Sequence, residues 1–211
     1  MIKPVSLILA ALLMAVQFVH AEDFVAGKDY EVLASPVHTQ NKNKVEVVEL
    51  FWWGCGHCYT FETMFDGWKK KQGDTINVVK MPAMWNKTMK LHAQAFYTAK
   101  ALGILDTING PFFKALNVDR RRLNSESQIQ EFFAKHGVDK STFEKTFNSF
   151  GVTSQVNLAE SRARSYRMQG TPEIVVEGKY RVSPGQAGSQ ARMLEITDFL
   201  IAKEQTARAA K

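Results

Sequence analysis

The sequence predicts an α/β fold that is interrupted by an all-helical block. Two observations carry this prediction. Runs rich in β-branched and apolar residues occur at 45–51, 76–81, 173–177 and 179–182, and such runs are typical of strands. Between the second and third runs, about eighty residues from 85 to 167 show helical periodicity and no convincing strand.

The first part of the α/β unit has the order strand, helix, strand. Residues 45–51 favour a strand that is buried on both faces, and residues 76–81 favour a second strand. Between them, apolar residues recur at helical spacing and Gly73 ends the pattern. The apolar side chains of this helix are Phe61, Met64, Phe65 and Trp68. A helix that joins two strands in this order predicts a right-handed crossover with parallel strands.

The helical block contains five predicted helices. Gly103 closes the first, Pro111 stands near the start of the second, and Gly170 follows the last, which spans 152–168. Ser125 and Gln128 form a capping box at the start of the third. The apolar positions of the first four helices are Leu91, Ala95, Ala99, Leu102, Phe112, Phe113, Leu116, Ile129, Phe132, Phe133, Phe143 and Phe147.

The strand pattern resumes after the helical block. Strands at 173–177 and 179–182 are joined at Gly178, and a two-residue hairpin turn with positive φ at this glycine fits the spacing. An amphipathic helix follows from about 190 to 203, and we expect the tail beyond Glu204 to be frayed. Its apolar positions are Met193, Leu194, Thr197, Leu200 and Ile201.

The N-terminus has the features of a secretory signal peptide. Lys3 precedes an apolar stretch over residues 5–19, and the small residue Ala21 suits a cleavage site directly after it. The stretch is short for a membrane anchor, and residues 22–211 then form the mature chain. The net charge is +6, but the basic residues are scattered apart from the runs 69–71 and 120–122, which we interpret as solvated helix ends. Nucleic-acid binding is therefore not predicted.

Cys55 and Cys58 are the only cysteines of the chain, and they stand where the first strand leads into the first helix. At a helix N-terminus, the Cys55 sulfur faces unpaired N–H groups and the positive end of the helix dipole, which favour the thiolate. His57 lies between the cysteines, and as imidazolium it would add positive charge. Because a stabilised thiolate favours the reduced form, the disulfide becomes a stronger oxidant.

Cys58 would lie one turn into the helix and be more buried than Cys55. Its reaction requires a proton acceptor, and Glu49 is the candidate because it is a carboxylate within an otherwise apolar strand. Burial should raise its pKa toward neutrality, which suits proton transfer. The alternative is that Glu49 ends the strand at a solvated surface.

Other interpretations of the cysteine pair have less support. Structural zinc needs four ligands, and the sequence has no second pair at ligand spacing. Attachment of haem needs histidine after the second cysteine, where this chain has Tyr59. An inert disulfide stays open, although so short a loop would stabilise the fold by only about 2 kcal/mol. The isolated histidines His38, His92 and His136 are interpreted as surface or packing residues.

Thr171 and Pro172 directly precede the third strand. A cis proline at this point would interrupt strand pairing and expose backbone groups for an extended peptide. An ordinary loop proline is the alternative, and local sequence does not distinguish the two.

Taken together, these motifs resemble those of the DsbA family of periplasmic thiol–disulfide oxidoreductases, over the whole mature chain. The resemblance is carried by residues 47–51, the segment Cys55-Gly56-His57-Cys58-Tyr59, residues 147–150, and residues 170–172 leading to 178–180. It implies a thioredoxin fold, formed by 22–84 and 169–211, with an inserted helical domain at 85–168. It also implies that Cys55 is the exposed nucleophile, Cys58 its buried partner, Glu49 a buried acid and Pro172 a cis proline beside the cysteines.

Two positions depart from the commonest pattern of that family. Gly56 stands where proline usually follows the first cysteine, and this is similar to protein disulfide isomerase. Thr171 stands where valine often precedes the cis proline, and this is similar to the periplasmic isomerases. We therefore expect an oxidant, but a milder one.

The sequence predicts a periplasmic dithiol oxidase that introduces disulfide bonds into reduced, unfolded exported proteins through Cys55 and Cys58, with no further cofactor. The resemblance implies reoxidation by a DsbB-like membrane quinone reductase, and we expect a monomer. Aromatic and apolar residues near the site, including Phe51, Trp52 and Trp53, are expected to contribute to a surface for unfolded substrates, although some of them belong to the core. The alternatives are an isomerase or reductase on the same fold, and a chaperone-like binding module with an inert disulfide.

Overall fold

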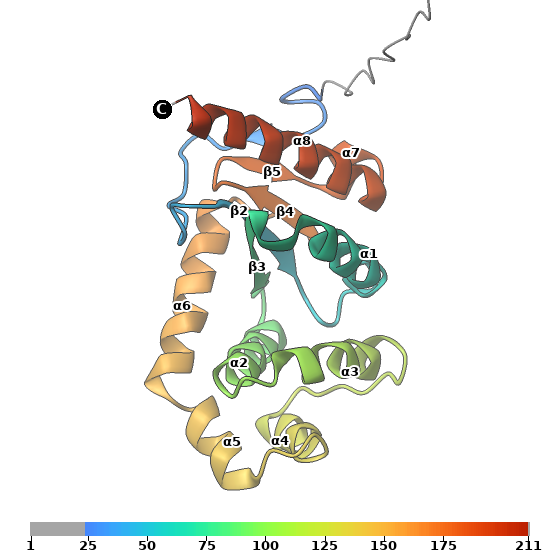
Figure 1. The fold of residues 1–211 in the computed structure, drawn as a ribbon. Coiled ribbons are helices and arrows are strands. Elements are labelled where there is room, and N and C mark those ends of the chain that lie inside the picture. The colour runs from blue at the N-terminus through green and yellow to red at the C-terminus, as the bar shows by residue number, and fades with distance from the viewer. Residues whose placement is uncertain (1–23, 211) are drawn as a thin grey trace, which may run out of the picture.

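The computed structural model describes residues 24–210 and contains one five-stranded mixed sheet (Figure 1). The strand order is β1-β5-β4-β2-β3, in which β2 and β3 are parallel and every other neighbouring pair is antiparallel. The strands are β1 (Glu31–Val32), β2 (Val45–Phe51), β3 (Ile76–Pro82), β4 (Glu173–Val176) and β5 (Tyr180–Val182). The predicted α/β fold is confirmed, including the parallel pairing of β2 and β3 through a helix.

Eight α-helices accompany the sheet in the described part of the chain. Three of them, α1, α7 and α8, belong to segments that also contribute strands, whereas α2 to α6 follow one another between β3 and β4. Their bounds are α1 (Gly56–Gln72), α2 (Lys87–Ala101), α3 (Leu105–Asn117), α4 (Glu126–Ala134), α5 (Lys140–Phe147), α6 (Phe150–Ser165), α7 (Pro184–Ala187) and α8 (Gln190–Ala209).

Strand β2 is buried along its whole length because both faces of the sheet are covered. Val45 and Val47 pack with apolar residues of α1 and α8 on one face. Val48 and Leu50 belong to the other core, which also contains the aromatic side chains of the helical block. The strand that leads to Cys55 is therefore held firmly on both sides.

The helices α2 to α6 form the lower part of the molecule in Figure 1, and α6 runs from that part back along the sheet. Aromatic rings fill their centre, for example Phe143 stacked on Phe147 and Phe112 edge-to-face against Phe132. These elements lie within the predicted helical block, although the domain limits at 84/85 and 168/169 stay a prediction.

The turn between β4 and β5 differs from the predicted two-residue turn. Val176 pairs with Tyr180, so three residues lie between the strands, and both Glu177 and Gly178 have positive φ. A Cβ atom at Gly178 would lie 2.0 Å from the carbonyl oxygen of Val37. Glycine is thus required here by the close approach of another segment as well as by its backbone conformation.

The expected fraying beyond Glu204 is wrong, since α8 continues to Ala209. Glu204 is buried and bonds to Tyr180 Oη at 2.9 Å and to Lys179 Nζ. Arg208 donates to the carbonyl oxygen of Lys42 at 2.6 Å and pairs with Glu177 at 2.6 Å. These contacts with distant segments hold the last turns, and the local sequence contains no sign of them.

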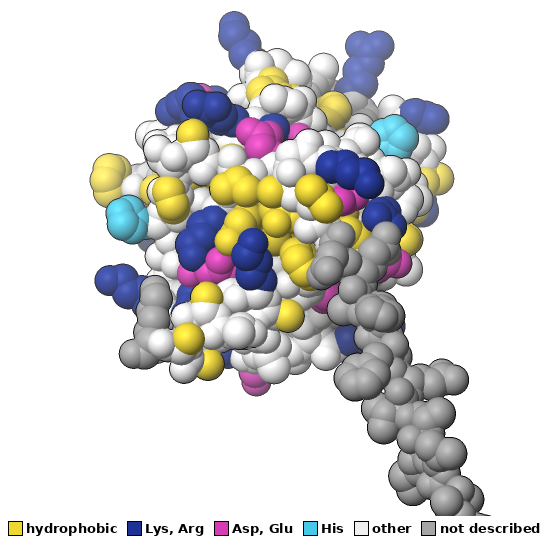
Figure 2. Space-filling view, turned by 90° about the horizontal axis from the view of Figure 1, so that it is seen from above, with side chains coloured by type: hydrophobic (Ala, Val, Ile, Leu, Met, Phe, Trp, Pro, Cys, Tyr) yellow, Lys and Arg dark blue, Asp and Glu magenta, His cyan; other side chains and the backbone are white. Residues whose placement is uncertain are grey.

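The predicted signal peptide and its cleavage after Ala21 lie outside the described residues. Within residues 24–210, no helix combines the length and apolar character that a membrane span needs. Figure 2 looks onto the α8 side and shows hydrophobic side chains at the centre, with basic and acidic side chains intermingled around them. Among its described residues, this face has no continuous basic surface of the kind that nucleic-acid binding requires.

Candidate active site

Cys55 caps the N-terminus of α1, directly after the loop that leaves β2. Its backbone is extended, with φ −87° and ψ 115°, and its sulfur accepts a hydrogen bond from the Cys58 N–H at 3.4 Å. The Cys55 N–H donates to the Trp52 carbonyl oxygen at 2.9 Å, which fixes the loop before the helix. The sulfur therefore occupies the place of an N-cap side chain, where negative charge is favoured.

These surroundings lower the pKa of Cys55 to about 5. The hydrogen bond from the Cys58 thiol contributes most, burial opposes it, and Thr171 and the backbone N–H groups of Cys58 and His57 add to the lowering. Cys55 is half-buried, so its thiolate is both stabilised and accessible.

Cys58 is fully buried, and both cysteines are free thiols in the structure. Burial raises the pKa of the Cys58 thiol far above its usual range, and the adjacent Cys55 adds to this effect. The pair thus consists of one acidic, accessible thiol and one buried thiol that keeps its proton.

The peptide bond between Thr171 and Pro172 is cis, as the resemblance implied. The Thr171 carbonyl oxygen accepts a hydrogen bond from Cys55 Sγ at 3.3 Å, across 116 residues of sequence. Thr171 is half-buried and Pro172 is buried. The fold therefore brings the cysteine motif and the proline motif into direct contact.

Glu49 is fully buried in β2, so the alternative of a solvated strand end is wrong. Lys80 Nζ lies 3.2 Å from Glu49 Oε2, yet neither carboxylate oxygen has a well-aligned hydrogen bond. Burial raises the pKa of Glu49 to about 7, and the Lys80 charge opposes this rise. A carboxyl group with this pKa exchanges protons readily near neutral pH.

A chain of polar contacts leads from Glu49 toward the surface. Lys80 pairs with Glu62 at 2.5 Å, and Glu62 accepts a hydrogen bond from Asn109, which in turn accepts one from Trp53 Nε1 at 2.8 Å. Lys80, Glu62 and Asn109 line an open cavity of about 780 Å³. The buried carboxyl is thus one ion pair away from a cavity that water can enter.

His57 is exposed, and the lowering of the Cys55 pKa that involves His57 comes from its backbone N–H. A role for its imidazole stays a prediction. Of the three aromatic residues expected to form a substrate surface, Phe51 and Trp53 are buried core residues, and only Trp52 is partly exposed. Phe51 and Trp53 are therefore the core members expected among these residues, because the sheet and the helical block enclose both rings.

A family model described as DSBA-like thioredoxin domain matches residues 46–192. The chain belongs to this family. It is a thiol:disulfide oxidoreductase of the DsbA type.

Individual DsbA proteins match over nearly the whole chain. The thiol:disulfide interchange protein DsbA of Pseudomonas aeruginosa is 38% identical over 96% of this chain and 98% of that protein. DsbA of Azotobacter vinelandii is 37% identical over 88% of this chain and 87% of that protein. The crystal structure of Pseudomonas aeruginosa DsbA has a TM-score of 0.85 and covers 90% of this chain and 99% of that chain. The thioredoxin-like fold expected from the resemblance is confirmed.

Within this DsbA framework, the structure adds contacts that no sequence pattern predicted. Trp52 Nε1 donates to His92 Nδ1 at 3.0 Å, and His92 Nε2 lies 2.9 Å from the Leu123 carbonyl oxygen. A Cβ atom at Gly54 would lie 2.4 Å from the Trp52 ring. Burial lowers the pKa of His92, so it is neutral and links the DsbA active-site loop to the helical block. The only sign of these contacts in the sequence was a tryptophan, Trp52, close to a glycine, Gly54.

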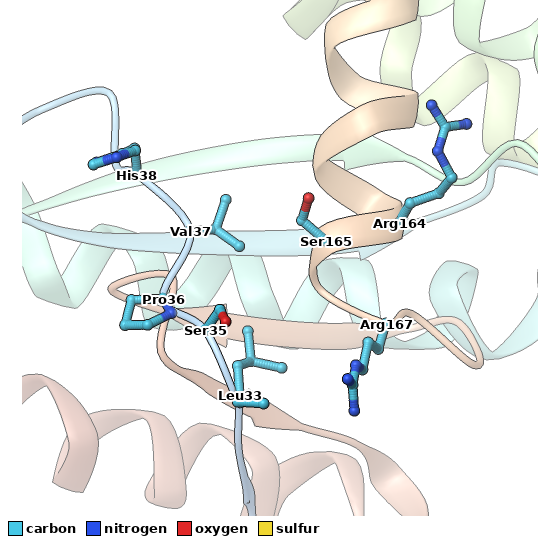
Figure 3. Close-up of a pocket in the computed structure, with 9 residues that line it drawn as sticks. Leu33, Ser35, Pro36, Val37, His38, Arg164, Ser165 and Arg167 are labelled. Carbon is cyan, nitrogen blue, oxygen red and sulfur yellow. The ribbon is translucent and has the colours of Figure 1, made fainter.

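Among residues 24–210, the remaining histidines do not join the cysteines of this DsbA-type site. His136 bonds to the Phe132 carbonyl oxygen at 2.8 Å. His38 lines a separate cavity of about 450 Å³, between the segment that follows β1 and the end of α6 (Figure 3). No group of three or more potential metal ligands occurs among residues 24–210.

Proposed function

We propose that the protein oxidises pairs of thiols in reduced, unfolded exported proteins and becomes a dithiol itself. The observation that carries this direction is the lowered pKa of Cys55, about 5, beside a buried Cys58. A thiol that is stable as an anion is a good leaving group, and its stabilisation favours the reduced form over the disulfide. Members of the DsbA family are periplasmic, which fits an oxidising role on exported chains.

The proposed reaction begins with the Cys55–Cys58 disulfide. A substrate thiolate attacks Cys55 Sγ, the bond between the two cysteines breaks, and Cys58 leaves with the electron pair. Glu49, protonated over part of the neutral range, supplies the proton that Cys58 takes up. A second substrate thiolate then attacks the substrate sulfur of the mixed disulfide and releases Cys55 as a thiolate. Two electrons pass to the protein, and the substrate gains one disulfide.

Thr171 and Pro172 would receive the substrate chain beside Cys55. This proposal is supported by the Thr171 carbonyl oxygen, which already contacts Cys55 Sγ at 3.3 Å, and by the cis bond that follows Thr171. An extended peptide could pair with the backbone at this point and bring its cysteine to Cys55.

The partners of the cycle are also proposed. Reoxidation by a DsbB-like membrane quinone reductase would restore the disulfide, with no cofactor in the protein other than Cys55–Cys58. We further propose that the protein is a monomer. A signal peptide would direct its export and be cleaved off after Ala21. Mass spectrometry of the protein recovered from a periplasmic extract measures the cleavage site directly.

The decisive measurement is the equilibrium of Cys55 and Cys58 with glutathione. We expect a potential well above that of thioredoxin, which is about −270 mV. A value near that of thioredoxin would overturn the oxidase direction and favour a reductase.

Two further readouts distinguish an oxidase from an isomerase and from a chaperone-like module. An isomerase must be kept reduced, so trapping of free thiols in cells distinguishes it from an oxidase, which accumulates as the disulfide. Cys55→Ser removes oxidase and isomerase activity alike, whereas a chaperone-like module would keep its binding function.

A further inference from the structure

Glu173 directly follows the cis proline and is almost completely buried, with 2% of its surface exposed. Its Oε1 accepts hydrogen bonds from the N–H groups of Gly170 at 3.0 Å and Gln169 at 3.3 Å. The carboxylate thus binds the two residues that precede Thr171, while its own backbone begins β4. Hydrogen bonds from N–H groups to a charged carboxylate are roughly twice as strong as neutral ones.

Arg181 of β5 lies next to this carboxylate and is also buried. Its Nη1 is 3.7 Å from Glu173 Oε2 and donates to the Arg167 carbonyl oxygen, and its Nη2 pairs with Glu31 of β1. Figure 3 shows Arg167 just past the end of α6. One arginine therefore connects β5, β1 and the segment that leads into the loop before Pro172.

Burying a carboxylate costs free energy unless it is ion-paired and hydrogen-bonded. The ion pair of Glu173 with Arg181 and its hydrogen bonds from Gln169 and Gly170 all hold the loop before Pro172. β4 also lies directly beside β2, since Glu173 pairs with Leu50, five residues before Cys55. Glu173 is accordingly held in register with the strand that carries the cysteine loop. Its side chain reaches the N–H groups of Gln169 and Gly170, the two residues that precede Thr171.

We infer that Glu173, held by Arg181, is a positioning residue that fixes the backbone of Thr171 for the extended substrate chain. The inference rests on the proposed function, because it assigns Thr171 to substrate binding. The partners of the Glu173 carboxylate are Gln169, Gly170 and Arg181, and neither cysteine is among them. Its effect passes through Gln169 and Gly170, whose N–H groups it binds, to Thr171, whose carbonyl oxygen contacts Cys55 Sγ.

The test compares Glu173→Ala and Glu173→Gln in steady-state oxidation of a dithiol peptide by the protein, with excess oxidised glutathione as the terminal oxidant that restores the Cys55–Cys58 disulfide. Alanine removes both hydrogen bonds to the loop, so the Thr171 backbone is held less firmly for the substrate. The expected loss is one hydrogen bond between Thr171 and the substrate chain, which raises KM about fivefold and leaves kcat within about twofold. Glutamine keeps an acceptor for the Gly170 N–H, so KM should stay close to that of the wild type. Glu204→Gln is the matched control, because it breaks the ion pair between another buried carboxylate and the partly exposed Lys179, away from the loop.

An unchanged KM in Glu173→Ala, with a loss of stability like that of Glu204→Gln, would show that Glu173 serves stability alone and would overturn the inference. If Glu173→Ala does not fold, hydrogen exchange of the wild-type protein tests the inference instead. The Gly170 amide should then exchange with solvent deuterium at least about tenfold more slowly than that of exposed Gly185, and equal rates would overturn the inference. Failure of the wild type to oxidise the peptide would instead refute the proposed function.

Discussion

Glu46 and Glu49 lie three residues apart on β2, and both side chains are fully buried, yet their surroundings differ. Glu46 pairs with Arg162 at 2.5 Å and accepts hydrogen bonds from the Gln40 N–H at 3.0 Å and Asn77 Nδ2 at 3.3 Å. Glu49 has no hydrogen bond that satisfies its oxygens and only Lys80, at 3.2 Å, as an ionic partner within the described residues.

Glu46 and Glu49 are equally buried, so the difference between them comes from the groups that each carboxylate contacts. Strand residues an odd number apart point to opposite faces, so each carboxylate meets a different set of elements. Glu46 is a structural anchor that ties α6 to the sheet through Arg162. Glu49 keeps a raised pKa of about 7 and lies near a water-accessible cavity through Lys80, which suits proton exchange.

The largest effect is expected for Glu46→Gln. It leaves the buried Arg162 guanidinium without its anion, so the free energy of unfolding should fall by about 3 kcal/mol or more. Urea unfolding measures this loss, and the oxidase rate per folded molecule should be unchanged. The double variant Glu46→Leu with Arg162→Met removes both charges and should recover most of the loss. A loss below about 1 kcal/mol in Glu46→Gln would contradict the structural role.

Glu49→Gln should change the pH dependence instead. The folded-state pKa of Glu49 is raised, so the wild type gains stability from its protonation below about pH 4.5 and loses that gain as pH rises through about 7. The loss should approach about 3 kcal/mol above that range, and Glu49→Gln should not show it. Unfolding at acidic and mildly alkaline pH measures the difference, and parallel profiles of the two proteins would refute the raised pKa.

The same variant tests the proton transfer. Without a group to exchange a proton with Cys58, thiol oxidation at neutral pH should slow by about 10²-fold. Stopped-flow tryptophan fluorescence follows this step, and the rate of alkylation of Cys55 serves as the control that should stay constant. An unchanged oxidation rate would remove Glu49 from the mechanism.

A smaller effect is expected for Lys80→Met. Lys80 lowers the pKa of Glu49, so its removal should move the Glu49 titration to higher pH. Carboxyl carbon chemical shifts measured over pH report this directly. A shift toward lower pH would show that Lys80 is not the dominant charge beside Glu49.

The smallest effect is expected for Asn77→Ala. It removes one hydrogen bond from Glu46 but leaves the ion pair with Arg162, so the stability loss should be about 1 kcal/mol. Chemical denaturation at neutral pH measures it. A loss as large as that of Glu46→Gln would mean that the hydrogen bonds, and not the ion pair, anchor this carboxylate.

Local sequence predicted most of the elements because their signals are local. Periodicity located β2, β3, α1 and the helical block within a few residues, and the glycines at 73 and 103 marked helix ends. β1 was missed because two residues are too short to show a pattern. The extra turn of α8 was also missed, since it depends on contacts of Arg208 with Lys42 and Glu177.

The sequence by itself determined that a Cys-x-x-Cys pair stands at the junction of a buried strand and a helix, and this junction is the source of the reactive thiol. It also identified Glu49 as an anomalous carboxylate. Only the tertiary structure decided which atoms each of these groups meets: the Thr171 carbonyl oxygen beside Cys55 Sγ, Lys80 beside Glu49, and Arg181 beside Glu173. The physical reason is that such contacts join elements that are adjacent in the sheet but distant in the chain. Strand order and register therefore select the partners, and neither is encoded in the residues around any one motif.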